Sequence, residues 1–280
     1  MTVFEAHKGR FTNNGLMDFS HNPRQSLIDG INTVIDQAIV AKYKEEYDKG
    51  RGSGIGDVAK KRIGSSYIGT ACDRELAFRY HKYPKEDRES VVSPGELNRH
   101  AQAGHWTEEK TAEWMRWAGF DLRTNKADGS QYGYKVARDP KTGQFRIAGE
   151  IDGVILGVPE KLQGKIKTPC LWESKKATDK KWKKFNDDGV AKADPEYYGQ
   201  VQTNMAYLAV DQTLFSMLNL DTMKYHWELI PLDTSVAQKL SDRAVRVLQS
   251  QSPADLARIT RDPNDFRCRF CDYHKQCWGL

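Results

Sequence analysis

Apolar residues first recur with helical spacing between residues 24 and 48. They stand three or four positions apart, at Leu27, Ile31, Val34, Ile35 and Ala38. This spacing predicts an amphipathic helix, and the glycine-rich stretch GRGSGIG at 50–56 that follows it is typical of a linker. The pattern therefore separates an N-terminal helical extension with its linker, residues 1–60, from a main domain, residues 61–280.

The same spacing predicts further helices in the main domain. One opens at Thr70, where Thr70 and Asp73 form a capping-box pattern. Others are expected at about 97–118, 195–210 and 235–249.

The middle of the chain changes to the pattern of strands, in which apolar and polar residues alternate. The segments are YGYKVA (132–137), FRIAGEIDGVILGV (145–158), CLWESKKA (170–177), TLFSMLNL (213–220) and KYHWELIPL (224–232). The order of helices, three strands, helix, strands and helix predicts an α/β fold. We expect a mixed central sheet flanked by helices.

Composition adds one local feature to this picture. With 280 residues, 39% of them hydrophobic, the chain can bury one sizeable core. The net charge is only +5, but residues 161–192 hold ten lysines against four acidic residues. Phosphate backbones are bound through such concentrations of cations, although a solvated surface shows the same pattern.

The chain is expected to work inside a cell, in the cytoplasm of a bacterium or of a phage-infected cell. No apolar run approaches the roughly 18 residues of a membrane helix. The first residues, MTVFEAHKGRFTNNG, lack the apolar segment of a secretory signal. In that setting the five cysteines argue against a disulfide framework.

Two predicted strands carry candidate catalytic residues. Asp152 lies in GEIDGVI, and Glu173 and Lys175 lie in LWESKKA. Strand alternation puts Glu173 and Lys175 on one face, and a turn-rich connection lets Asp152 approach Glu173. Side-by-side carboxylates suit Mg²⁺ or Mn²⁺, which would polarise a phosphate and activate water. An ordinary charged hairpin is the alternative, because isolated Glu-x-Lys triplets are common.

A third carboxylate lies on the helix predicted at about 97–118. Glu108 falls on the apolar stripe of this helix, whereas Glu109 lies off it. A carboxylate on an inward face needs a partner or a metal ion. His105 is either a ligand or a partly buried histidine with its own hydrogen bonds.

The order GHWTEE, GEIDG, WESKK and YYGQVQTNMAYL resembles the PD-(D/E)XK nuclease superfamily, specifically its RecB-like and lambda-exonuclease-like branches. The resemblance implies a catalytic set of Glu108, Asp152, Glu173 and Lys175, with the metal held by the three carboxylates and the backbone carbonyl of Ser174. It also implies an active-site glutamine on the following helix, Gln202 or Gln200. RecB-like nucleases space this glutamine four residues from a tyrosine, but Gln202 and Tyr207 are five apart.

The cysteines add a second motif. Cys268, Cys271 and Cys277 cluster within ten residues, and Cys72 is the natural fourth ligand. Together with SSYIGTACDRELAFRY, this arrangement is similar to the iron–sulfur nucleases, which include the AddB nuclease domain, a eukaryotic replication helicase-nuclease and the CRISPR-associated RecB-like exonucleases. The resemblance spans roughly residues 65–280 and implies a 4Fe–4S cluster.

Two other readings of the cysteines stay open. Cys268, Cys271, His274 and Cys277 together are a possible local zinc site, although their spacing is tight for one. Free thiols are the remaining alternative. Cys170 is expected to be a small core residue.

Interleaved lysines and an aromatic residue follow the catalytic strand. They are Lys176, Lys180, Lys181, Trp182, Lys183 and Lys184. This composition suits single-stranded DNA, in which bases stack on aromatic rings and phosphates pair with lysines. Trp182 filling the core, with the lysines solvated, is an equal alternative.

These features predict a divalent-metal-dependent DNA nuclease, with exonuclease action implied by the family resemblance alone. It would act on DNA ends or single strands in recombination, repair or CRISPR spacer processing, with partner proteins from those pathways. The alternatives are a DNA-binding or assembly module with an unused nuclease fold, and a nicking or restriction-type endonuclease.

Overall fold

The computed structural model describes residues 23–48, 61–86 and 93–280. These residues fall into two compact units. The smaller unit holds helix α1 (Pro23–Asp48) and residues 93–101, and the larger unit holds residues 61–86 and 102–280. Helix α4 (Pro94–Trp117) contributes its first turns to the smaller unit and its remainder to the larger one.

The smaller unit confirms the predicted N-terminal helix. Asp36 of α1 accepts hydrogen bonds from the side chains of Ser93 and Arg99. The apolar residues Leu27 and Ile31 are exposed. The glycine-rich segment 50–56 lies outside the described residues.

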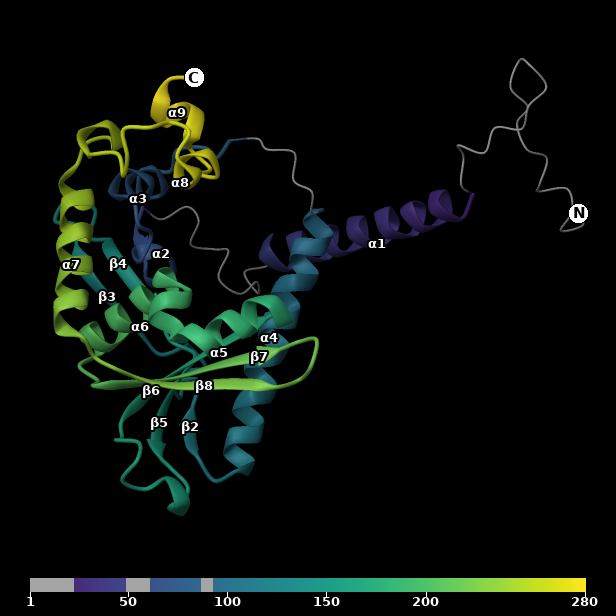
Figure 1. Ribbon diagram of the computed structural model, residues 1–280, viewed down its shortest axis with the longest axis vertical. Helices are drawn as coiled ribbons and strands as arrows, with labels where there is room; N and C mark the ends of the chain where they lie inside the picture. The colour runs from purple at the N-terminus through teal and green to yellow at the C-terminus, as the bar shows by residue number, and fades with distance from the viewer. Residues whose placement is uncertain (1–22, 49–60, 87–92) are drawn as a thin grey trace, which may run out of the picture. The chain divides into compact units, whose positions relative to one another are not determined.

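The larger unit contains two sheets rather than the single sheet that the sequence predicted (Figure 1). The smaller sheet has the order β1-β4-β3, formed by Ile63–Gly64, Phe145–Glu150 and Gly133–Arg138. The larger sheet has the order β2-β5-β6-β7-β8, formed by Asp121–Arg123, Gly153–Gly157, Cys170–Ala177, Gln212–Asn219 and Tyr225–Pro231. Strands β6 and β7 are parallel and the other pairs of this sheet are antiparallel. The prediction of mixed strands flanked by helices is therefore confirmed.

The predicted strand at 145–158 is in fact two strands that belong to different sheets. The chain leaves β4 after Glu150 and enters β5 at Gly153. At the crossing point, the Ile151 N–H donates to the carbonyl of Tyr132 at 3.0 Å. Asp152 occupies the junction, and this break in the strand directs where its side chain lies.

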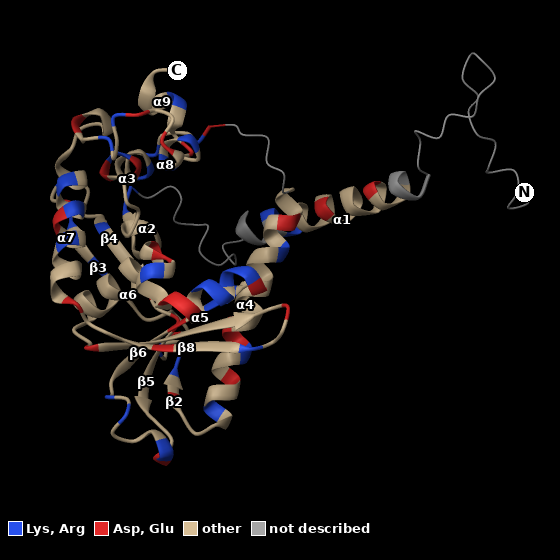
Figure 2. Cartoon of the chain, viewed as in Figure 1, with Lys and Arg blue, Asp and Glu red and all other residues tan. Residues whose placement is uncertain are grey.

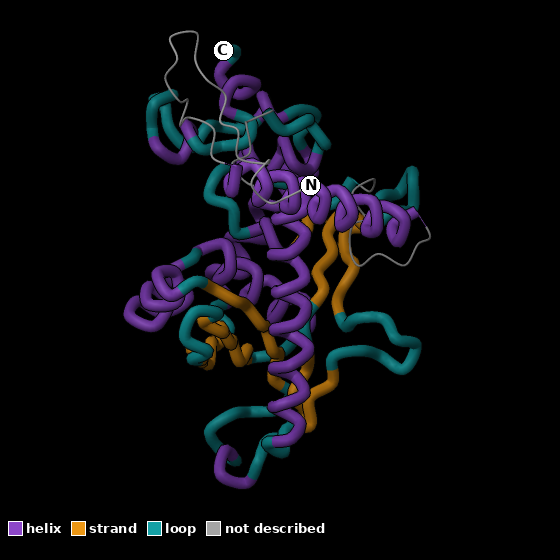
Figure 3. The backbone as a smooth tube through the Cα atoms, turned by 90° about the vertical axis from the view of Figure 1, so that its right-hand side faces the viewer, coloured by secondary structure: helices purple, strands orange, loops and turns teal. Residues whose placement is uncertain are grey.

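The larger unit also contains several helices. In addition to α4 they are α2 (Ser65–Ile68), α3 (Asp73–Tyr80), α5 (Asp179–Ala193), α6 (Pro195–Leu208), α7 (Thr234–Gln249), α8 (Phe266–Arg269) and α9 (His274–Trp278). Of these, α4, α5 and α6 pack against the larger sheet. The predicted helices at 97–118, 195–210 and 235–249 are confirmed to within a few residues. In Figure 3, α4 is the long vertical helix in front of the strands. No described helix is both long enough and apolar enough to cross a membrane.

The predicted helix start at Thr70 is wrong. Helix α3 begins at Asp73 with Cys72 as its N-cap residue, and no side chain caps it. The Thr70 hydroxyl instead donates to a carboxylate oxygen of Glu196 at 3.1 Å, on α6. A hydrogen bond to another helix has replaced the local one that the capping pattern assumed.

Alternation along β6 separates two parts of the core. Leu171 packs with residues of α5, α6 and β7, including Phe185 and Phe215. Trp172 faces the opposite side and packs with Ala112 and Met115 of α4. Since both faces of β6 are covered, the residues at its carboxyl end are held in fixed positions.

Close approach of α2 and α6 depends on glycine at position 199. A Cβ atom added there would lie 2.7 Å from the Cα of Gly69, which is a backbone atom that cannot rotate away. We expect Gly199→Ala to lower the free energy of unfolding by about 1–3 kcal/mol, as overpacking does. Urea unfolding of the variant and the wild type measures the difference.

Gly104→Ala is the matched control, because it also places alanine in a helix. Its Cβ would meet only Lys176 Cε at 3.6 Å, an ordinary contact. We expect this variant to be as stable as the wild type or more so, since alanine favours helix. Equal stability of all three proteins would contradict the close approach.

Candidate active site

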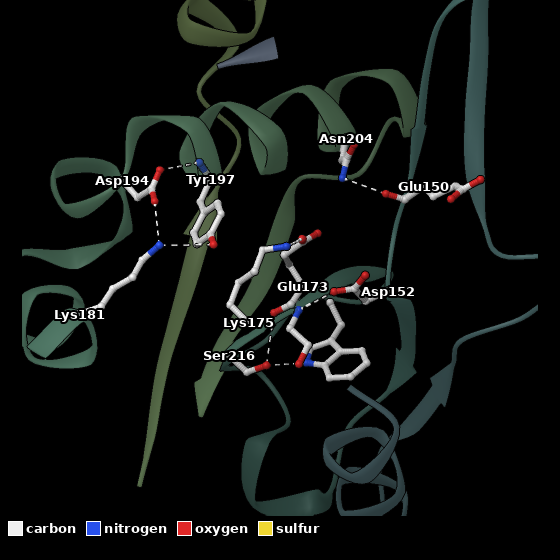
Figure 4. Close-up of polar contacts among 11 residues, drawn as sticks. Glu150, Asp152, Glu173, Lys175, Lys181, Asp194, Tyr197, Asn204 and Ser216 are labelled. Carbon is white, nitrogen blue, oxygen red and sulfur yellow. Dashed lines mark hydrogen bonds and ion pairs between the residues drawn. The ribbon is translucent and has the colours of Figure 1, made fainter. Parts of the chain in front are cut away.

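Glu173 lies on β6, and Asp152 lies directly before β5, the antiparallel neighbour of β6, so the two carboxylates approach each other as the sequence predicts. The register pairs Gly153 of β5 with Trp172 of β6. The Ser174 N–H donates to Asp152 Oδ2 at 2.7 Å, which holds the aspartate against the β6 backbone (Figure 4). Glu173 is only 2% exposed.

Lys175 supplies the positive charge next to these carboxylates. Its ammonium group forms an ion pair with Glu173, and its side chain is 20% exposed. The ammonium also lies 5.1 Å from the centre of the Tyr197 ring. Two-residue spacing on one strand face therefore brings the acid and the base together, as Figure 4 shows.

Glu108 of α4 completes the group, and its charge contributes to the raised pKa of Glu173. Burial, and then the neighbouring charge of Asp152, raise the pKa of Glu108 to about 7, while Lys175 opposes the shift. Burial also raises the pKa of Asp152 and of Glu173. Three carboxylates beside one lysine leave negative charge in a buried place, where an additional cation would be stabilising.

The residues of this group fit a hard divalent cation. Carboxylate oxygens are the ligands that Mg²⁺ and Mn²⁺ prefer. Within residues 23–48, 61–86 and 93–280, no three His, Cys, Asp or Glu side chains already converge on a single point. Lys175 and the Ser174 N–H instead occupy the carboxylate oxygens of Glu173 and Asp152.

A groove of about 640 Å³ opens onto this group. Glu108 and Asp152 line it, and so do the basic side chains of Arg62, Lys126 and Lys135. These three basic residues are scattered over 74 positions of the chain, so no local pattern in the sequence marks them. The groove thus combines a charged reaction centre with cations suited to a phosphate backbone.

The structure places Gln202 outside this groove. Its amide N–H donates to the carbonyl of Pro231 at 2.9 Å, and its carbonyl accepts from the Asp233 N–H at 2.7 Å. The side chain is thus fully used in joining α6 to the end of β8. Gln200, the other glutamine considered, lines the groove instead. Two residues along a helix correspond to about 200°, so one glutamine faces the site when the other faces away.

The lysine-rich segment after β6 forms helix α5, which the sequence did not predict (Figure 2). Several of its lysines have partners within the chain. Lys181 lies 3.3 Å from Asp194, Lys183 lies 2.6 Å from Asp179, and Lys184 donates to the Ala193 carbonyl at 2.7 Å. Trp182 is partly buried against the core, which agrees with the packing alternative.

Cys72 and three cysteines near the C-terminus line one small cavity. Cys72, Cys268, Cys271 and Cys277 surround a space of about 60 Å³. That volume is several times the roughly 10–15 Å³ that one water molecule needs. His274 also lines the cavity, and its buried Nδ1 has no hydrogen-bond partner among the described residues.

Contacts around the cavity tie the C-terminal segment to α3 and the residues after it. The Tyr273 ring stacks on Phe78 with centroids 5.0 Å apart. Arg258 lies 4.2 Å from the Trp278 ring centre and donates to the Cys277 carbonyl at 2.7 Å. Burial raises the pKa of Cys271 to about 12, with smaller contributions from nearby groups including Cys72 and Cys277. The thiols therefore lie close enough to influence one another.

No family model matches the sequence, and comparison with curated proteins finds no match. Among solved structures, the chain is similar to SSO0001, with a TM-score of 0.46 and 14% identity over 85% of this chain and 94% of that one. It is also similar to an alkaline exonuclease (LHK-Exo) from Laribacter hongkongensis, with a TM-score of 0.41 and 16% identity over 67% of this chain and 86% of that one. A phage-related exonuclease from Haemophilus somnus 129PT gives a TM-score of 0.44 and 15% identity over 69% and 95%. These TM-scores are too low to establish a common fold.

The buried carboxylates predict that stability falls as pH rises in buffer free of divalent cations. Burial, and then the charge of Asp152, raise the pKa of Glu173 to about 7 in the folded state. An acid whose pKa is raised by folding binds its proton more tightly in the folded state. Its contribution to stability is therefore complete below the pKa of the unfolded state and is lost as the pH rises through 7. Glu173 alone would contribute up to about 3 kcal/mol. Urea unfolding between about pH 5 and pH 8 measures this loss.

Glu173→Gln is the control for this pH series. It keeps the shape of the side chain and removes the titrating group, so its stability should depend less on pH than that of the wild type. Identical pH profiles for the two proteins would show that Glu173 does not titrate as its burial requires.

Proposed function

We propose that this chain is a divalent-metal-dependent DNA nuclease of the PD-(D/E)XK type. The observation that carries the proposal is the group of buried Glu173 with half-buried Asp152 and Lys175, in which Asp152 lines a groove with basic walls. A structural ion pair needs one carboxylate for one lysine, whereas here Glu108 adds a third carboxylate with a raised pKa. Excess buried negative charge is what a cation-dependent reaction centre requires.

The chain's own residues take distinct roles in this proposal. Glu108, Asp152, Glu173 and the Ser174 carbonyl hold Mg²⁺ or Mn²⁺, which when bound polarises the scissile phosphate and lowers the pKa of the attacking water. The Ser174 N–H keeps Asp152 turned towards the site. Lys175 orients the water and stabilises the charge that develops on the phosphate.

Basic groups along the groove suit the DNA backbone. Arg62, Lys126 and Lys135 line the same 640 Å³ space as Glu108 and Asp152. Gln200 lines it too, and we assign to Gln200 rather than Gln202 the role of the active-site glutamine. Action on DNA ends, and thus exonuclease activity in recombination, repair or spacer processing, is the part of the proposal that rests on the sequence motifs.

We also propose that Cys72, Cys268, Cys271 and Cys277 hold a 4Fe–4S cluster. Four sulfurs around one tetrahedral zinc ion lie about 3.8 Å apart, given Zn–S bonds of about 2.3 Å. A cluster separates its cysteines further and needs space between them, which the cavity provides. Its role is structural, since the contacts beside it bind the C-terminal segment to α3.

Lys175→Ala is expected to lower DNA cleavage at least about 100-fold, because it removes the charge that stabilises the developing anion. The measurement uses end-labelled single- and double-stranded DNA with Mg²⁺ or Mn²⁺, after anaerobic purification. Lys192→Ala is the matched control, since that lysine is exposed and pairs with Asp188 on α5. Its activity should equal that of the wild type.

A covalently closed circular substrate separates the alternatives. An exonuclease leaves the circle intact, and a nicking or restriction-type endonuclease cuts it. Binding without cleavage by folded wild-type protein, with either metal, would identify a DNA-binding module and contradict the proposed activity.

Cys277→Ala is expected to remove the iron and sulfide and to lower the melting temperature. Cys170→Ala is the control, because Cys170 is buried in β6 and does not line the cavity. His274→Ala distinguishes the two alternatives for this site. It would abolish zinc binding by the three C-terminal cysteines and His274, but it would leave a cluster held by four cysteines in place. Zinc without iron in the wild type, lost on replacing His274, would overturn the cluster.

A further inference from the structure

Strand β8 is an edge of the five-stranded sheet, and one side of its backbone faces outwards. Among the described residues it pairs with β7 alone. The Asn219 N–H donates to the Lys224 carbonyl, and the Leu232 N–H donates to the Asp211 carbonyl, each at 2.9 Å. Even-numbered residues of this segment therefore direct their backbone groups towards β7.

The odd-numbered residues of β8 direct theirs away from the sheet, because the direction alternates along a strand. Tyr225, Trp227 and Leu229 thus offer both N–H and carbonyl groups along the free edge. Pro231 has no N–H and lies at the end of the strand, where an edge tolerates it. Figure 1 shows β8 at the front of the sheet.

An apolar cavity of about 430 Å³ lies beside this edge. Its lining includes Trp114, Phe120, Ile166, Tyr225 and Trp227. Trp227 is 43% exposed and stacks on Tyr225 with centroids 5.0 Å apart. The Tyr225 hydroxyl is already bonded to that of Thr111 at 2.7 Å, so the surface offers few polar groups to a small ligand. A contiguous apolar surface of this kind is typical of a protein interface.

We propose that β8 pairs in antiparallel fashion with β8 of a second copy of this chain, about a two-fold axis at Trp227. The pairing joins the two five-stranded sheets into one and satisfies the outward backbone groups of both edges. Trp227 then faces Trp227 of the second copy, and Tyr225 faces Leu229. These apolar rings cover the mouths of the two cavities.

Complementary polar side chains select this register. A two-fold axis at Trp227 places His226 opposite Glu228 of the second copy, twice over, on the other face of the sheet. His226 and Glu228 already lie 3.3 Å apart within one strand, so the pairing continues an alternation of acid and base. An axis at Glu228, the midpoint of the strand, would place two glutamates opposite each other, which is destabilising.

The oligomeric state tests the proposal, measured by light scattering with size-exclusion chromatography. The wild type is expected to be a dimer, and Trp227→Lys and Leu229→Lys to be monomers, because each puts a charge into the apolar contact. Trp117→Lys is the matched control; this tryptophan is 74% exposed near the end of α4 and should be replaced without dissociation. Thermal melts confirm that each variant is folded.

Disulfide trapping tests the register independently. In a hydrogen-bonded antiparallel pair the Cα atoms lie about 5.5 Å apart, within the range a disulfide spans. Trp227→Cys should therefore form an intermolecular disulfide in oxidised glutathione. The amount of disulfide-linked dimer should exceed that of the wild type, which has only the native cysteines. Tyr225→Cys should not, because its two copies lie about 13 Å apart in this register.

Either of two results would overturn the proposal. One is a wild type that is monomeric up to about 100 µM. The other is a dimer that Trp227→Lys and Leu229→Lys leave intact, which would place the interface elsewhere. Trapping at Tyr225 but not at Trp227 would contradict the register.

Discussion

A carboxylate that is almost fully buried must find opposite charge nearby, and Glu173 meets this requirement on its own strand. Lys175 lies two residues further along β6 and forms the ion pair. Both faces of β6 are covered, by α5 and α6 on one side and α4 on the other, and this covering buries the pair. With one lysine already used by Glu173, the charges of Asp152 and Glu108 require another source of compensation. The packing that shields these carboxylates from water also makes their uncompensated charge unfavourable, so a bound cation would be stabilising.

The junction at Asp152 shows how architecture positions this charge. Had the apolar run at 145–158 continued as one strand, Asp152 would have been one residue of a ladder. Because the chain instead passes from the small sheet to the large one, the aspartate lies at the border of both and at the edge of the groove. Of the charged residues that line the groove, Lys135 lies on the small sheet, Glu108 on α4 and Asp152 between the two sheets.

The parts of the fold and of the candidate site that depend on residues close together in the sequence could be predicted from it. Alternation along β6 fixed the common face of Glu173 and Lys175, and helical spacing placed Glu108 inwards on α4. The division into two sheets could not be predicted, because an apolar run does not reveal where a strand changes partners. Helix α5 was missed because its lysines resemble a solvated loop, although Phe185 and Val190 supply its buried side.

Long-range contacts account for the remaining differences. Thr70 bonds to Glu196, which lies 126 residues away, and this contact outweighs a capping pattern that is favourable locally. Gln200 and Gln202 lie on different sides of α6, about 200° apart around the helix axis. The spacing in the sequence motif does not say which of the two sides faces the site. Arg62, Lys126 and Lys135 come together only through the fold.

The cysteine cavity also has a consequence for how the protein is made. About 200 residues separate Cys72 from Cys268. At a translation rate of about 5–20 residues per second, the first thiol waits roughly 10–40 s on the ribosome before its neighbours are synthesised. Every catalytic carboxylate emerges within that interval. Closure of the cavity is therefore a late step of biosynthesis, and a nascent chain can carry all its acidic site residues while the segment that secures α3 does not yet exist.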